Sequence, residues 1–261
     1  MPESTQDSYR QGQSEEIELL CLAARIVLES GGETYRVEET VRRMAEGLGL
    51  KDVNVVAFPT SLFVADGRNA QVCRVTHRST NMKRLAYAND ISRRVASRDM
   101  DAAQARQALE ETARLPSPPQ WLLVLMYGLT AASFTLLFGG DIGTFIVAFF
   151  IGVLVQLVQP AFSRIEMGTL FANFAGGFIT ALCAHALHLF IPYGSINAVI
   201  VGGIMPLLTG LLMTTAVRDT MYGDLVSGVA RVVEALLLST SVALGVYVAL
   251  KLFTMLGGTP V

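Results

Sequence analysis

The densest cluster of ionisable residues in the second half of the sequence lies between positions 218 and 234. Glu234 falls inside an apolar stretch, where a charge is costly, so its carboxyl group is expected to serve proton coupling or gating. Arg231 stands three residues earlier and could pair with it on one helical face. The alternative for Arg218, Asp219, Asp224 and Arg231 is a solvated loop with ordinary ion pairs, and for these charges we expect structural gating at most.

A second chemical feature is the motif GGIMP at 202–206, which is followed by Thr209. Gly202 and Gly203 loosen a helix and Pro206 removes a backbone donor, so this apolar segment is expected to be interrupted near its middle. Transporters use interrupted helices to present free backbone groups to a substrate. A proline kink with close helix packing explains the same residues, and the sequence leaves both readings open.

The preceding apolar segment carries Asn173, His185 and His188. Asn173 is expected either to form a hydrogen bond between helices, which we favour, or to contact a substrate. His185 could relay protons near neutral pH, but interfacial hydrogen bonding is the favoured role. Neither carboxylates nor cysteines stand at matching spacing, so no metal site is expected.

Common enzyme motifs are missing from the sequence. It holds no G-x-x-x-x-G-K-[ST], no H-E-x-x-H and no G-x-S-x-G. We therefore expect no catalytic residues, no enzymatic activity and no cofactor. The net charge of −2 gives no reason to expect nucleic-acid binding. The three cysteines are far apart in the sequence and suggest neither a disulfide framework nor a zinc site.

Charge is distributed very unevenly along the 261 residues. Residues 1–118 contain 33 of the 42 Lys, Arg, Asp and Glu side chains. Such a chain is expected to combine a charged globular part with an apolar part that needs lipid. The first 16 residues lack the apolar core of a secretory signal, so the following domain is expected in the cytoplasm. The predicted parts are a disordered tail (1–16), a cytoplasmic α+β domain (17–115), a proline-rich linker (116–120) and a five-helix transmembrane domain (121–261).

The period of the apolar residues predicts the elements of the first domain. Helical spacing alternates with short β-rich runs that are separated by Pro59 and by the turn signal Asp66-Gly67. These runs predict a small antiparallel sheet. The predicted helices are 17–29, 34–48, 81–95 and 101–115, and the predicted strands are 53–58, 61–65 and 71–76.

Five later segments are apolar and close to the length needed to cross a hydrocarbon core of about 30 Å. The loops after the first and third lack Lys and Arg, whereas those after the second and fourth carry Arg164 and Arg218. This alternation predicts a cytoplasmic N-terminus and an external C-terminus. The predicted fold is a membrane α-helical bundle of five transmembrane helices with an N-terminal cytoplasmic α+β domain. The segments are 121–138, 142–163, 168–191, 195–217 and 232–250.

Three segments carry a resemblance to a known family. They are E-S-G-G-E-T-Y-R-V-E-E-T-V at 29–41, F-P-T-S-L-F-V at 58–64, and P-L-L-T-G…R-D…G-D-L-V-S-G-V-A-R at 206–231. With the layout over residues 17–250, the chain resembles the threonine/serine exporter family, specifically the YjjP-type large subunit of its split branch. The resemblance implies a bacterial inner-membrane exporter of succinate, threonine or serine. It also implies a separate small membrane subunit as partner, because full-length members continue into a second membrane domain.

The leading hypothesis is therefore a subunit of a secondary transporter for a small organic acid or amino acid. The alternative is a membrane-anchored sensor or regulator whose cytoplasmic domain binds a ligand or partner, and a homo-oligomer is compatible with either. A transporter predicts polar residues converging from several spans, whereas a sensor predicts its best pocket in residues 17–115. The candidate pathway or coupling residues are Asn173, His185, Gly202, Gly203, Pro206, Thr209, Asp219, Asp224, Arg231 and Glu234.

Overall fold

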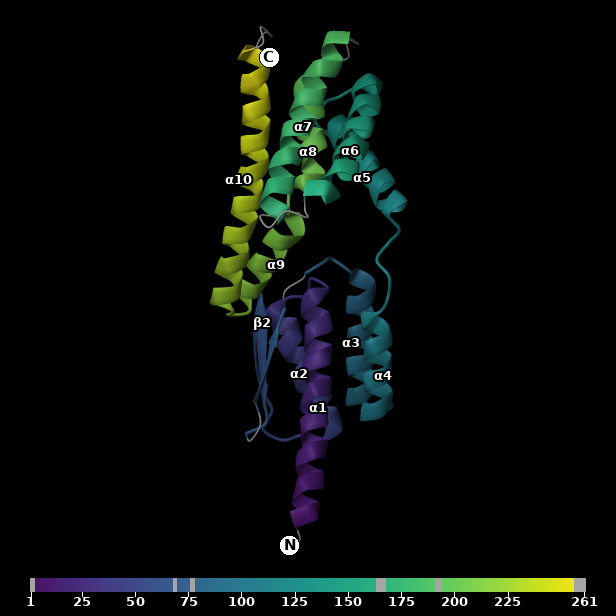
Figure 1. The fold of residues 1–261 in the computed structure, drawn as a ribbon, viewed down its shortest axis with the longest axis vertical. Helices are drawn as coiled ribbons and strands as arrows, with labels where there is room; N and C mark the ends of the chain where they lie inside the picture. The colour runs from purple at the N-terminus through teal and green to yellow at the C-terminus, as the bar shows by residue number, and fades with distance from the viewer. Residues whose placement is uncertain (1–2, 68–69, 76–77, 163–167, 191–193, 256–261) are drawn as a thin grey trace. The chain divides into compact units, whose positions relative to one another are not determined.

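The computed structural model describes residues 3–67, 70–75, 78–162, 168–190 and 194–255. Within these residues the chain is mostly helical and contains one three-stranded sheet (Figure 1). Two compact units are present, and neither is continuous in sequence. The first unit joins Met1–Ser117 to Thr214–Arg231, and the second joins Pro118–Met213 to Val232–Val261. Arg164, which helped to orient the predicted spans, lies outside the described residues.

The first unit is organised around α1 (Glu3–Glu29), which contacts α2, α3, α4 and two strands of the sheet. Its second half is apolar on more than one face, as is typical of a helix surrounded by other elements. Leu19, Leu20 and Val27 are almost completely buried there. The helix begins within the segment predicted as a disordered tail, and the domain boundaries remain predictions.

A small sheet forms one part of this unit. Its strands β1 (Asn54–Phe58), β2 (Ser61–Ala65) and β3 (Ala70–Arg74) are antiparallel and adjacent in chain order, as the alternating pattern predicts. Leu62 and Val64 on β2 are buried, whereas Phe63 between them is exposed. Since successive side chains point to opposite faces, one face of the sheet joins the core and the other remains open.

Two helices of the first unit pack closely because of a glycine. They are α2 (Thr34–Leu48) and α3 (Met82–Ala96), and α4 (Ala102–Ala113) packs on α3. A Cβ atom at Gly47 would lie 2.3 Å from the carbonyl oxygen of Val95, so only glycine fits at this crossing. The predicted N-cap of α4 is present, since Asp101 accepts a hydrogen bond of 2.8 Å from the backbone of Gln104.

The second unit consists of apolar helices. Four helices of the described chain are long and apolar enough to cross a membrane: α5 (Gln120–Leu137), α6 (Ile142–Phe162), α7 (Gly168–Phe190) and α10 (Leu225–Met255). A fifth span results if α8, the short 3-10 turn η1 and α9 are counted as one bent segment. Half of the apolar stretch of α7 is buried, against 22% for α5, so α7 is the more interior helix of the two. The outward Trp121, Ile142 and Phe150 are exposed, as lipid-facing side chains would be.

The predicted interruption of the fourth apolar segment is present. Helix α8 (Ile196–Ile204) ends in η1 (Met205–Leu207), Leu208 is extended, and α9 (Gly210–Met221) restarts with a bend of 54°. Proline has no N–H to continue the helical ladder, so the chain tightens into a 3-10 turn at Pro206. The missing donor is therefore the local cause of the break.

Close backbone packing surrounds the break. A Cβ atom at Gly202 would lie 2.1 Å from Thr135 Oγ1 on α5, and one at Gly203 would lie 2.6 Å from Thr180 Cγ2 on α7. Gly176 on α7 similarly lies against Leu207. Small residues let helices approach in lipid, where burial of apolar side chains gives little driving force. The packing reading of Gly202 and Gly203 is thus supported by geometry.

A second pair of glycines joins α7 to α10. A Cβ atom at Gly177 would lie 2.4 Å from the carbonyl oxygen of Val242, and one at Gly245 would lie 2.1 Å from that of Phe174. The hydroxyl of Ser241 adds a hydrogen bond to the carbonyl oxygen of Leu170. The two helices therefore approach at backbone distance, and no larger side chain fits between them.

We predict that Gly177→Ala destabilises the second unit by about 1–3 kcal/mol, because the added methyl group overpacks the α7–α10 contact. Thermal unfolding of the purified protein in detergent measures the loss. Gly210→Ala is the matched control, since no atom of the described chain lies within 4 Å of its added Cβ. Equal melting temperatures for the two variants would contradict the close approach.

Candidate functional site

Most of the predicted polar cluster belongs to the first unit. The segment Thr214–Arg231, which includes the end of α9 and the start of α10, is part of that unit although it follows apolar helices in the sequence. It contacts the turn between α1 and α2 through Gly32 and Thr34. Two of the segments that carry the family resemblance, 29–41 and 206–231, therefore meet in space.

The centre of this contact is a buried ion pair between Asp219 on α9 and Arg231 on α10. Arg231 Nε lies 3.0 Å from Asp219 Oδ2, and the two side chains are 4% and 0% exposed. Removing two charges from water costs several kcal/mol per ion, so both need good geometry and further hydrogen bonds. We call this interaction the Asp219–Arg231 pair.

Two backbone groups of the segment before and at the start of α2, and one hydroxyl on α9, form further hydrogen bonds with the pair. Arg231 donates to the carbonyl oxygen of Gly32 over 3.1 Å and to Thr215 Oγ1 over 3.3 Å. Asp219 Oδ1 accepts from the backbone N–H of Thr34 over 3.2 Å. Thr34 is the first residue of α2, so the carboxylate lies where the helix dipole favours negative charge. The pair thus binds α9 and α10 to the start of α2.

A second, more exposed layer of contacts lies beside the pair. Glu33 is buried and binds Arg36 Nε at 3.1 Å through one carboxylate oxygen and Arg218 through the other. Tyr35 stacks on Tyr222 with ring centroids 4.0 Å apart and an interplanar angle of 9°. One carboxylate and one aromatic pair therefore connect the first turn of α2 to the end of α9.

Glycines and a cap explain why the sequence folds this way. Gly31 and Gly223 adopt φ of +87° and +91°, a conformation that disfavours side chains, and they turn the chain on each side of the contact. Asp224 begins α10 by accepting a hydrogen bond from the backbone of Ser227. A Cβ atom at Gly228 would lie 2.1 Å from Thr220 Oγ1, so α9 and α10 pack closely at this turn.

The predicted solvated loop is wrong for Asp219 and Arg231, because both are buried. Arg218 is exposed and Asp224 is partly exposed, as a loop predicts. The ion pair described for Arg231 joins it to Asp219, twelve residues earlier, whereas the sequence offered Glu234. Glu234 is partly exposed on the part of α10 that belongs to the second unit. The missed signal is the turn Gly223-Asp224, which folds α10 back against α9.

The other candidates lie in the second unit. Asn173 and His185 are buried on α7. Pro206 lies within η1, and Thr209 follows the end of η1 by two residues. His185 Nδ1 lies 3.0 Å from the carbonyl oxygen of Ala181, one turn earlier in α7, and a carbonyl oxygen only accepts, so Nδ1 donates to it. The role of His185 stays a prediction. Thr135 and Thr180, which sequence reasoning did not single out, contact the Gly202-Gly203 step directly. Each hydroxyl bonds a carbonyl of its own helix.

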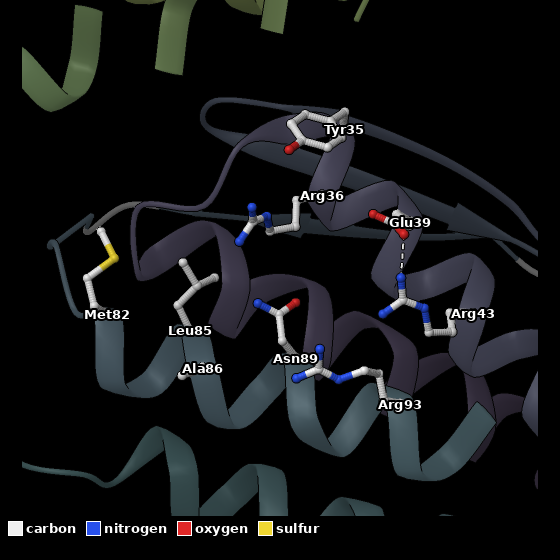
Figure 2. A pocket seen from close by; sticks show the side chains of 9 residues that line it. All are labelled: Tyr35, Arg36, Glu39, Arg43, Met82, Leu85, Ala86, Asn89 and Arg93. Carbon is white, nitrogen blue, oxygen red and sulfur yellow. Dashed lines mark hydrogen bonds and ion pairs between the residues drawn. The ribbon is translucent and has the colours of Figure 1, made fainter. Parts of the chain in front are cut away.

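A polar groove lies elsewhere in the first unit, between α2 and α3. Its volume is about 470 Å³, within the range of small-molecule sites. Figure 2 shows side chains from both helices facing this space. The lining residues are Tyr35, Arg36, Glu39, Arg43, Met82, Leu85, Ala86, Asn89 and Arg93.

We predict that Arg231→Met destabilises the first unit by about 3–5 kcal/mol, because it leaves the Asp219 carboxylate buried without its cation. The double variant with Asp219→Leu removes both charges and should recover part of that loss. Denaturant unfolding in detergent measures the difference. Arg218→Met is the control and should cost about 1 kcal/mol or less, since the Arg218 side chain is 51% exposed. Equal losses for the two arginine variants would argue against a dominant buried pair.

Comparison with known proteins places the chain in a family. The model of a family described as "Putative threonine/serine exporter" matches residues 18–253. A "Probable threonine/serine exporter" of Mycobacterium tuberculosis is 27% identical over 248 residues, which are 92% of this chain and 47% of that protein. A "Threonine/serine exporter" of Corynebacterium glutamicum is 25% identical over 90% of this chain and 51% of its own length.

A third relative has nearly the same length as the chain. The "Probable succinate transporter subunit YjjP" of Klebsiella aerogenes is 24% identical over 91% of this chain and 94% of its own length. The chain thus spans about half the length of the mycobacterial and corynebacterial relatives. No solved structure matches. Because the family model covers most of the sequence, including both segments that meet at the Asp219–Arg231 pair, the chain belongs to the threonine/serine exporter family.

Proposed function

We propose that the chain is a subunit of a secondary transporter that exports a small hydrophilic metabolite across the bacterial inner membrane. The observation that carries the proposal is the interruption of an apolar segment between α8 and α9, inside a unit of membrane-length helices. Breaks of this kind are tolerated in a membrane when they line a cavity or are covered by protein. They supply backbone groups that can bind a polar substrate.

Two buried polar atoms support a binding site at the break. Thr180 faces Gly203 and Gly176 faces Leu207, so α7 and α8 run antiparallel. Asn173 lies about one turn beyond Gly176 on α7, and Thr209 follows Leu207 by two residues, so we propose that both line the break. Asn173 Nδ2 and Thr209 Oγ1 are buried and have no hydrogen-bond partner within the described chain. A buried polar atom without a hydrogen bond destabilises the fold, so a substrate or a water molecule is expected to form the missing hydrogen bonds with these two atoms.

The donors at this place suit a carboxylate. The amide nitrogen of Asn173 donates, and the N-terminus of α9 carries the positive end of a helix dipole. A Cβ atom at Gly210, the first residue of α9, would meet no described atom within 4 Å, which leaves room there. Succinate, threonine and serine, for which the relatives are named, all carry a carboxylate. We propose a cargo of this class.

The proposed topology has five spans, with α8, η1 and α9 forming one. The N-terminus and the domain 17–115 lie in the cytoplasm after a tail at 1–16, the segment 116–120 is the linker, and the C-terminus lies outside. Glu234 is the proposed coupling carboxylate, and the Asp219–Arg231 pair with Asp224 is the proposed gate. The chain is proposed to carry no catalytic residue and no cofactor.

A separate small membrane protein is the proposed partner. The similar-length relative is named as a subunit, and the two exporters named for threonine and serine are about twice as long as this chain. A second protein that supplies the remaining membrane domain would account for both facts. A homo-oligomer of the chain remains compatible with this assembly.

The second candidate function is a membrane-anchored sensor. The observation that favours it is the groove between α2 and α3, because a sensor predicts a pocket within residues 17–115. The two functions are compatible in one chain, since a transporter subunit can also bind a regulator.

Efflux from preloaded proteoliposomes tests the transporter proposal. We predict that labelled succinate, threonine or serine leaves vesicles that contain the chain and its partner subunit faster than vesicles with either protein alone. The chain alone should be slow, because it would supply only part of the pathway. Full efflux by the chain alone would refute the partner, and no efflux of any of the three cargoes by the pair would refute the transporter.

We predict that Pro206→Ala reduces export severalfold while the protein still inserts and folds. Alanine restores the missing N–H and favours a continuous helix, which withdraws backbone groups from the site. Initial efflux rates at equal protein content provide the measurement. Pro160→Ala, in the helix α6, is the control and should export normally. A Pro206→Ala rate equal to that of the control would reduce the break to a packing feature.

A further inference from the structure

Of the three arginines that line the groove between α2 and α3, two pair with carboxylates and one, Arg93, has no ion pair within the described residues. Three arginines line the groove, against one carboxylate, Glu39. Glu39 pairs with Arg43, and Arg36 binds Glu33 through its Nε atom. The Arg93 side chain forms no hydrogen bond or ion pair with any other residue that the structure describes, although it faces the same space (Figure 2). The groove therefore keeps unsatisfied guanidinium donors.

The lining residues of the groove are suited to binding an anion that also has an apolar part. Figure 2 shows Arg36 reaching into the groove from α2, with Asn89 and Arg93 facing the same space from α3. Tyr35 lines the groove beside Arg36 on α2. Guanidinium groups bind carboxylate or phosphate oxygens through paired, charge-assisted hydrogen bonds. Met82, Leu85 and Ala86 supply a short apolar wall at the other end.

We propose that this groove binds a small anion with at least two negative charges, either a dicarboxylate or a phosphate compound. Arg36 and Arg93 bind the anionic groups, Asn89 donates between them, and the wall near Leu85 contacts any aliphatic carbons. Serine, a zwitterion with a single carboxylate and no net charge, binds poorly, because its ammonium group is repelled by the arginines. The lining residues of the groove belong to the first unit and those of the break to the second, so the proposal uses none of the residues of the proposed export pathway.

Two residues of the groove also belong to the contact with α9. Arg36 shares the Glu33 carboxylate with Arg218, and Tyr35 stacks on Tyr222. An anion on Arg36 competes with Glu33 for the same guanidinium and so alters the Glu33–Arg218 ion pair. Occupancy of the groove is thereby transmitted to the turn between α9 and α10. The groove is therefore a regulatory site, and the element that it regulates is the turn between α9 and α10.

Isothermal titration calorimetry on the full-length protein in lipid nanodiscs tests the site, with succinate, inorganic phosphate and serine as probes. We expect wild-type protein to bind succinate or phosphate, and Arg93→Gln to bind that anion about tenfold more weakly, the loss typical of one charged hydrogen bond. Arg94→Gln is the matched control, because Arg94 is the next residue on α3, is exposed and does not line the groove. Arg93→Lys should recover part of the affinity.

The two probes distinguish a carboxylate from a phosphate ligand. No binding of either anion, or equal affinities for Arg93→Gln and Arg94→Gln, would overturn the proposal. The calorimetric experiment measures binding alone. The proposed anion site is therefore tested whether or not the chain exports a cargo, and a failed efflux experiment would not contradict it.

Hydrogen–deuterium exchange tests the link to α9. At an anion concentration near the wild-type Kd, amides in 215–228 should change their exchange rates in wild-type protein and much less in Arg93→Gln, which is then mostly unoccupied. A change in exchange rates that is confined to α2 and α3 would contradict the link, because the groove would then bind its anion without any effect on the turn between α9 and α10.

Discussion

The first unit depends on the burial of the Asp219–Arg231 pair. Both charges lie away from water, so each must be met by an opposite charge and by backbone groups at fixed places. Those groups belong to Gly32 and Thr34, which commits the turn before α2 to one position against α9 and α10. Glu33 and Tyr35, next in the chain, then reach Arg218 and Tyr222. A single buried interaction thereby sets the register of the whole contact.

The second unit obeys a different constraint, the approach of helix backbones. In lipid, apolar side chains gain little by meeting one another, so helices associate where small residues allow close contact. Glycines provide such contacts between α7 and α10 and between α8 and its neighbours α5 and α7. The break follows directly on this tightly packed part of α8, at Pro206. A rigid segment is thus joined directly to an irregular one, which is the arrangement that the transport proposal uses.

Periodicity in the sequence was enough to predict most local elements, but not the part of α1 before residue 17, which was predicted as a disordered tail. The three strands and the helices of the first domain follow from apolar spacing, and the interruption at 202–206 follows from the loss of a donor at proline. The sequence did not predict that Asp219 and Arg231 are buried, because charges near an apolar segment are usually solvated at its end. It also missed Thr135 and Thr180, since hydroxyl side chains that bond their own helix leave no spacing pattern.

By itself the sequence determined where the chain is charged, where it is apolar, which segments are helical and which family it belongs to. These properties depend on residue type and on neighbours within a few positions. Tertiary structure alone decided that Thr214–Arg231 joins the first unit, that Arg231 pairs with Asp219, and that arginines of α2 and α3 share one groove. Such contacts join residues up to 199 positions apart, and Arg231 reaches the Gly32 carbonyl because α9 and α10 pack against the start of α2. Desolvation and backbone hydrogen bonding act between whole elements, so no local pattern records them.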